Sequence, residues 1–215
     1  NDVVANGSFS ISGVTTGATI GDLSGTGATA SVVLGSKTLT LGTTSSSSFA
    51  GVISGTGALT KQGSGTLTLT GANTYSGATT ISAGTLALSG SGALKSTNDV
   101  VANGTFSISG VTTSSTIGDL SGSGTVAIGA KTLTLGTSSN SSYSGKITGT
   151  GNITKNGTGQ LTLSGDLSGL SGGTTTISNG VLSLTTAIYP ADGHSFSIGL
   201  DKVLNLEPSG TAICG

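Results

Sequence analysis

Residues 1–27, NDVVANGSFSISGVTTGATIGDLSGTG, return as residues 98–124, NDVVANGTFSISGVTTSSTIGDLSGSG, 97 positions further along the chain. The match resumes after a deletion of three residues, so that KTLTLG at 37–42 recurs at 131–136. Chains built from copies usually stack them rather than folding each copy around its own core. The repeat therefore indicates a long scaffold or a binding surface. It argues against an active site, where unlike groups converge.

The composition of the 215 residues is far from that of an average globular protein. Charged residues make up 7% and aromatic residues 3%, glycine occurs 39 times and arginine is absent. Disordered chains usually combine low hydrophobicity with high net charge. Here the net charge is −1, and Leu, Ile and Val recur at regular places. An ordered chain is expected, and without clustered basic residues it is not expected to bind nucleic acid.

Other partners and cofactors are excluded in the same way. No apolar run approaches the roughly 20 residues of a membrane-spanning helix. Cys214 is the only cysteine, so neither an internal disulfide nor a cysteine metal site is predicted, and no cofactor is expected. Because the chain begins with Asn1 rather than Met, the sequence is expected to be a mature or excised piece.

A shorter motif lies inside each long copy: an apolar residue, Ser/Thr-Gly-Ser/Thr-Gly, and then a strand of the Thr-Leu-Thr-Leu type. It opens at Leu23, Ile53, Leu88, Leu120 and Ile147, with spacings of 30, 35, 32 and 27 residues. Strict alternation of Leu with Thr is the period of a β-strand with one buried face. The predicted core stack consists of eight leucines: Leu39, Leu41, Leu67, Leu69, Leu133, Leu135, Leu161 and Leu163.

Two all-β folds fit this pattern. The preferred prediction is a parallel β-helix (β-solenoid) with turns of roughly 20 to 30 residues, stacked at about 4.8 Å, which gives about 7 to 11 turns. The alternative is a pair of tandem Ig-like β-sandwiches of about 100 residues each. A sandwich needs a bulky core, whereas this chain has no Trp and 4 Phe. The predicted organisation is one continuous solenoid, with copies at 1–97 and 98–188 and a terminal coil, cap or assembly segment at 189–215.

The motif is most complete in residues 55–88, GTGALTKQGSGTLTLTGANTYSGATTISAGTLAL. Its diagnostic positions are Lys61, Gly63, Gly65, Leu67, Leu69, Asn73, Tyr75, Gly77, Thr79, Ile81, Gly84 and Leu86. This segment resembles the passenger-associated transport repeat of bacterial autotransporters. The resemblance implies a right-handed parallel β-helix in the exported part of a surface protein, a stalk or an adhesin, without a catalytic residue.

A weaker copy of the same pattern covers residues 149–184. It keeps Lys155, Gly157, Gly159, Leu161, Leu163, Ile177, Gly180 and Leu182. It departs from the pattern at residues 166–170, where DLSGL replaces the Asn-Thr-Tyr segment and adds two residues. An insertion of this kind is expected in a loop at a corner of the solenoid.

Residue types that are rare elsewhere gather after residue 188. The predicted assembly segment comprises Tyr189, Pro190, His194, Phe196, Ile198 and Cys214. One interpretation is a final coil or cap that closes the open end of the solenoid. The other is a surface that docks onto the next subunit or domain. A catalytic triad of His194, Ser195 and Asp192 is disfavoured, because a nucleophile and its base must face each other across a site.

Several further residues recur in register. Lys37, Lys61, Lys131 and Lys155 are predicted at solvated corners with buried stems, or else as charged guards of a sheet edge. Asp22 and Asp119, in identical contexts, are expected to stabilise turns rather than to bind calcium. Tyr75 and Tyr143 are expected to pack in the interior.

The function predicted from the sequence is a non-enzymatic, extracellular structural or adhesive β-solenoid, forming a stalk or passenger segment of a bacterial surface protein. Its expected partners are neighbouring copies of itself, adjoining solenoid repeats, or a host or cell-surface ligand. The alternative is a subunit of a self-assembling extracellular filament. A third hypothesis is ice binding through threonine ladders, suggested by the pairs Thr38/Thr40, Thr66/Thr68 and Thr132/Thr134. With few charges, the stability is expected to depend little on salt or pH.

Overall fold

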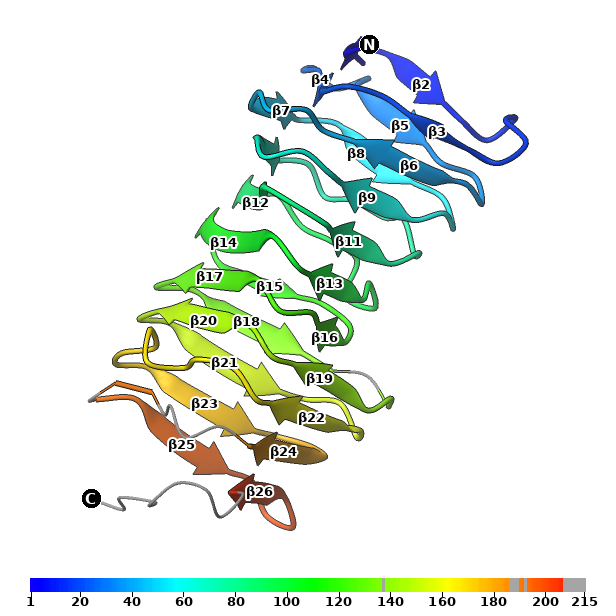
Figure 1. The fold of residues 1–215 in the computed structure, drawn as a ribbon. Coiled ribbons are helices and arrows are strands. Elements are labelled where there is room, and N and C mark those ends of the chain that lie inside the picture. The colour runs from blue at the N-terminus through cyan, green and yellow to red at the C-terminus, as the bar shows by residue number, and fades with distance from the viewer. Residues whose placement is uncertain (137, 186–189, 192, 207–215) are drawn as a thin grey trace.

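A computed structural model describes residues 1–136, 138–185, 190–191 and 193–206 of the chain. Within these residues the chain consists of parallel β-strands and turns, without a helix. Strands of successive turns pair side by side: Thr66 pairs with Thr85, 19 positions further on, and Phe9 with Val32, 23 positions further on. Figure 1 shows the resulting elongated stack of about ten turns. The predicted β-solenoid is confirmed, and the alternative of two sandwiches is wrong.

Each turn crosses three faces in the same order, which we call faces A, B and C. Face A joins the pair β1–β4 to the six-stranded sheet β7–β10–β12–β14–β17–β20, through an isolated bridge between Gly25 and Phe49. Its strands are β1 (Val3–Val4), β4 (Leu23–Ser24), β7 (Ser47–Phe49), β10 (Thr66–Leu69), β12 (Thr85–Gly90), β14 (Thr105–Val111), β17 (Thr125–Gly129) and β20 (Lys146–Gly149).

Face C joins the six-stranded sheet β3–β6–β9–β11–β13–β16 to the four-stranded sheet β19–β22–β24–β26, through a bridge between Gly122 and Tyr143. Its strands are β3 (Gly17–Thr19), β6 (Thr38–Leu41), β9 (Leu59–Lys61), β11 (Thr79–Ile81), β13 (Val100–Ala102), β16 (Leu120–Ser121), β19 (Ser141–Tyr143), β22 (Gln160–Leu163), β24 (Val181–Leu184) and β26 (Val203–Leu206).

Face B contains two separate sheets. The first is β2 (Ser8–Ser10), β5 (Ser31–Val33) and β8 (Val52–Ser54). The second is β15 (Ser114–Thr116), β18 (Thr132–Leu135), β21 (Asn152–Lys155), β23 (Thr174–Ile177) and β25 (Ser195–Ile198). Between them the chain is irregular, and an isolated bridge between Ala72 and Ala93 is the β-pairing there.

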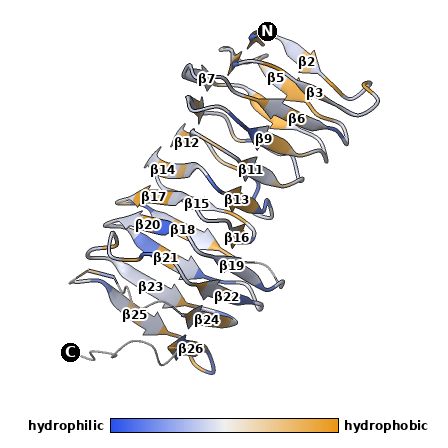
Figure 2. Cartoon of the chain, viewed as in Figure 1, coloured by the Kyte–Doolittle hydropathy of each residue, from blue (hydrophilic) through white to orange (hydrophobic). Residues whose placement is uncertain are grey.

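The core fills the inside of the stack because every strand alternates. In the Thr-Leu-Thr-Leu strands both leucines point inward and both threonines point outward, so that leucines of successive turns lie on one another. Burial of one such side chain contributes roughly 1.5 to 3 kcal/mol relative to its exposure. In Figure 2 the ribbon of β23, which carries three threonines, is largely pale.

The two long copies occupy different faces, which the sequence did not predict. Between β1 and β13 the chain passes face A at β4, β7, β10 and β12 and then continues to face C. The Asn-Asp-Val-Val segment therefore lies on face A in the first copy and on face C in the second. The sequence of β3 and β6 moves from face C to face B, where it forms β15 and β18. A repeat of 97 residues is four turns and two further faces, so the second copy is rotated about the axis.

Candidate functional site

The two segments that carry the repeat motif are built in the same way. In the first, β9 pairs with β11 and β10 pairs with β12, so that the segment stacks its second half on its first. In the second, β21 pairs with β23 and β22 with β24. The eight predicted core leucines, from Leu39 to Leu163, are each at most 3% exposed. Leu86 and Ile81 of the motif are fully buried among them.

The motif glycines lie where two turns of backbone come very close. A Cβ atom at Gly63 would lie 2.1 Å from the carbonyl oxygen of Thr43, and one at Gly84 would lie 2.4 Å from that of Gly63. Both residues also have φ near +65°, with 67° at Gly63 and 63° at Gly84. A Cβ atom at Gly65 or Gly77 would lie as close to a carbonyl oxygen of the preceding turn, so the pattern of glycines reflects the stacking of corners.

Lys61 and Lys155 are buried, and the prediction of solvated corners is wrong for both. They are 1% and 2% exposed, in line with inward-pointing apolar residues of the turns before and after. Nζ of Lys61 donates to the carbonyl oxygens of Gln62 and Gly63, the latter at 2.9 Å, and Nζ of Lys155 donates to that of Gly157. The sequence contained a signal for this burial. In the alternating pattern both lysines occupy positions of the same set as the inward-pointing leucines. Lys37, by contrast, is half-buried, and its Nζ donates to the carbonyl oxygen of Thr15 at 3.1 Å.

A carboxylate lies near each buried lysine. Burial lowers the pKa of Lys61, and the charge of Asp22 opposes that shift; Asp119 acts in the same way on Lys155. Asp22 accepts hydrogen bonds from Thr43, at 2.7 Å from the hydroxyl and 3.0 Å from the backbone nitrogen, and the hydroxyl bond is the main cause of its lowered pKa. Asp22 thus ties two turns together.

The Asn-Thr-Tyr corner of the first repeat is a buried polar cluster. Oδ1 of Asn73 accepts from the nitrogen of Ile53 at 2.9 Å, and Nδ2 of Asn73 donates to two carbonyl oxygens. The hydroxyl of Tyr75 lies 2.6 Å from that of Thr79, which donates to Oδ1 of Asn98 at 2.5 Å. Burial raises the pKa of Tyr75. The role of Asn98 was not foreseen, because it lies outside the motif.

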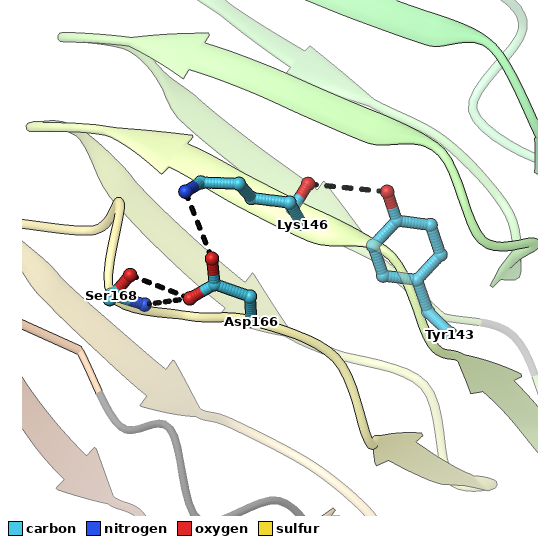
Figure 3. A network of polar contacts seen from close by, with 4 residues as sticks. All are labelled: Tyr143, Lys146, Asp166 and Ser168. Atoms are coloured by element: carbon cyan, nitrogen blue, oxygen red, sulfur yellow. Dashed lines mark hydrogen bonds and ion pairs between the residues drawn. The ribbon is translucent and has the colours of Figure 1, made fainter.

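The corresponding corner of the second repeat is held from the outside (Figure 3). Asp166 forms an ion pair with Lys146, with Oδ2 and Nζ 2.9 Å apart, and accepts two hydrogen bonds from Ser168. The bond from the Ser168 hydroxyl is the main reason why the pKa of Asp166 falls to about 2. Nearby, the buried Tyr143 donates to the carbonyl oxygen of Gly124 at 2.8 Å. The inside of the corner is filled by Leu167 and Leu170, each 1% exposed.

The assembly segment predicted after residue 188 is partly described. Tyr189 and Cys214 lie outside the described residues, as does Asp192. His194 lies 2.9 Å from the Thr175 hydroxyl and 2.7 Å from the carbonyl oxygen of Gly172, and its ring contacts that of Phe196 edge-on. Those partners fix the imidazole to the preceding turn.

Among the described residues no group of acidic, His or Cys side chains has the arrangement of a metal site, and no helix is long and apolar enough to cross a membrane. Pro190 is partly buried, while Ile198 is 49% exposed.

The two motif segments also match a known protein family. Residues 59–88 and 153–184 match the family model of the passenger-associated transport repeat. The chain carries two passenger-associated transport repeats. It is also 36% identical, over 212 residues, to a protein named adhesin BmaC autotransporter from Brucella suis biovar 1 (strain 1330). That match covers 94% of this chain and 6% of the relative, so the chain spans a small part of the relative's length. No solved structure matches.

These findings confirm the resemblance of residues 55–88 and 149–184 to the passenger-associated transport repeat. A passenger is the exported part of an autotransporter, so the two matches indicate an extracellular or bacterial cell-surface location. The two repeats do not face the same way: the first occupies faces C and A, and the second faces B and C.

Proposed function

We propose that the chain is a non-enzymatic, adhesive segment of a bacterial surface protein, in which the solenoid is both spacer and contact surface. The observation that carries the proposal is the match along almost the whole chain to an adhesin. The construction agrees with this role. Hydrogen-bond ladders and a continuous Leu, Ile and Val core run along the stack, which leaves the outward side chains of three faces available for contacts.

Adhesion is tested with beads that carry the purified chain. Beads coated with the native chain, the heat-denatured chain or albumin are applied to cultured mammalian epithelial cells and washed at controlled shear. We expect beads with the native chain to be retained well above both controls. Retention no greater than that of the albumin beads would overturn the adhesive role.

A filament subunit remains the second candidate, because the last described turn exposes apolar side chains. Leu200 is 93% exposed, and Val203 and Leu206 are more than 40% exposed. In the described chain β25 and β26 pair on one side only, with β23 and β24. Negative-stain electron microscopy over a concentration series tests this candidate. Fibres that disappear when residues 189–215 are removed would support it, and discrete short rods at every concentration would exclude it.

A further inference from the structure

The second sheet of face B carries a regular array of hydroxyl groups, which we call the hydroxyl array. Strands β15, β18, β21, β23 and β25 pair in register, and each turns two side chains outward, so the outward residues form two columns. Figure 1 shows these five strands one beneath another. The first column is Ser114, Thr132, Asn152, Thr174 and Ser195; the second is Thr116, Thr134, Thr154, Thr176 and Ser197. Nine of these ten residues carry a hydroxyl.

The spacing of the array follows from the sheet itself. Neighbouring strands lie about 4.8 Å apart, and residues two apart on one strand are about 6.6 Å apart. Thr has two heavy atoms on Cβ and therefore few rotamers, which holds its methyl and hydroxyl groups in a repeated orientation. The array is thus a nearly rectangular net of outward side chains, in which the threonines also present methyl groups.

Most of these hydroxyls are left unpaired by the protein. Thr174 and Ser195 share a hydrogen bond of 2.9 Å. In the described part of the chain, the hydroxyls of the other seven donate to no protein atom and accept from none. All ten side chains of the array are half-buried or exposed. Their hydrogen bonds must therefore be made to something outside the protein.

The chemistry of the array selects the kind of ligand. None of its residues is charged, so it offers nothing to a phosphate or carboxylate polymer. None is aromatic, so it has no ring on which a sugar could stack. What it offers is an uncharged, two-dimensional repeat of hydrogen-bonding groups, and the matching partner is a lattice with the same properties. Ordered water makes hydrogen bonds nearly as favourable as direct ones.

We propose that the hydroxyl array binds the surface of ice, by ordering a layer of water that is continuous with the crystal lattice. The three Thr pairs that suggested ice binding in the sequence do not form one ladder. Thr38/Thr40 lie on face C, Thr66/Thr68 on face A and Thr132/Thr134 on face B. The array instead combines one of these pairs with Thr174/Thr176 and with strands that the sequence did not single out.

The first copy supplies a matched control. Its equivalent strands β3, β6, β9 and β11 carry one complete column, Thr19, Thr40, Thr60 and Thr80. The companion positions are Gly17, Thr38, Ala58 and Ala78, of which only Thr38 has a hydroxyl. Face C therefore presents a single column of threonines on equivalent parallel strands. By our proposal, a single column is not sufficient to bind ice.

The test is inhibition of ice recrystallisation by the full chain, with incorporation into a growing ice hemisphere as a second readout. We expect the wild-type chain to arrest grain growth and to enter the ice. The double variant Thr134→Lys/Thr154→Lys should behave like albumin in both assays. The equivalent double variant of the first copy, Thr40→Lys/Thr60→Lys, should retain the wild-type activity. Circular dichroism and thermal melting establish that both variants are folded.

Three results would overturn the proposal. The first is a wild-type chain that neither slows recrystallisation nor enters ice. The second is an equal loss of activity in the two double variants. The third is retention on crystalline cellulose, or self-association through face B, without an effect on ice. The bead assay is independent of these outcomes, so adhesion and ice binding can fail separately.

Discussion

The two passenger-associated transport repeats differ most at one corner of the solenoid. The interior of that corner is filled by a polar side chain in the first repeat and by apolar side chains in the second. In the first repeat Asn73 is inside the corner and satisfies three backbone groups with its amide. In the second repeat the equivalent residue is Leu167, and the polar contacts lie outside, on Asp166. The strands next to both corners form the same kind of parallel pair, each with four residues in register. The hydrogen-bond ladders therefore determine the fold. The interior of the corner can be polar or apolar, provided that its buried polar groups have hydrogen-bond partners.

Exchanging the two corner residues should therefore damage both repeats. Asn73→Leu leaves the nitrogen of Ile53 and two carbonyl oxygens without the amide, and we expect it to cost about 3 kcal/mol. Leu167→Asn buries an unpartnered amide and should cost about as much. Urea unfolding measures both changes. Thr74→Ser, an exposed change that copies the second repeat, should stay within about 0.5 kcal/mol. If both exchanges were as mild as this control, the corners would be interchangeable.

The buried lysines, which both repeats share, should make stability rise with pH, contrary to the weak pH dependence expected from the small number of charges. Their folded pKa values are lowered, so between pH 8 and 9.5 the unfolded chain binds more protons than the folded chain. The increase can reach about 1.4 kcal/mol per pH unit for each lysine that is neutral only when folded. Measurements should stop below about pH 10, where tyrosines titrate in the unfolded chain.

Lys61→Met/Lys155→Met should remove this rise in stability, as followed by the urea midpoint at each pH. The control is Lys37→Met/Lys131→Met. These two lysines correspond to each other in the two copies, as Lys61 and Lys155 do, but they lie outside the repeat motif. A wild-type urea midpoint that does not change from pH 8 to 9.5 would contradict the lowered pKa values of the two buried lysines.

The sequence was sufficient for the fold and insufficient for the arrangement of its surfaces. Alternation in Thr38–Leu41 and the motif in residues 55–88 predicted parallel strands, inward leucines and the family resemblance. The rotation between copies was not predictable, because loops such as residues 71–78 hide the length of a turn. The polar contacts of Asn98 join residues 19 to 23 positions apart, which becomes visible only when turns of about that length are stacked.

A smaller difference between the copies concerns β15 and its equivalent, β3. Ser115 points inward where the first copy has Ala18, and its hydroxyl is buried without a partner. A hydroxyl in that position costs about 1 kcal/mol or more. We expect Ser115→Ala to raise stability by about 1 kcal/mol, measured as a higher urea midpoint with an unchanged slope. Ser114→Ala, on the neighbouring exposed position, should have little effect. A loss of stability on Ser115→Ala would show that the hydroxyl has a partner, such as a trapped water.

The smallest effect is expected from the ion pair that only the second copy has. Lys146 and Asp166 stand where the first copy has Val52 and Ala72, so Lys146→Val/Asp166→Ala restores the first copy's residues. Both side chains are partly exposed, and pairs of that kind contribute little because solvent and salt screen them.

The sign of its pH dependence follows from the lowered pKa of Asp166. Since the folded pKa of about 2 is below the ordinary aspartate value of 3.8, the stabilisation is complete above about pH 4 and is lost as the pH falls through about 2. The melting temperature of the double variant should therefore be slightly lower than that of the wild type at pH 7 and equal to it at pH 2, and the difference should shrink in 1 M salt. A steep acid transition of the wild type near pH 4 that the variant lacks would mean that this one pair, rather than the ladders and the core, holds the second repeat together.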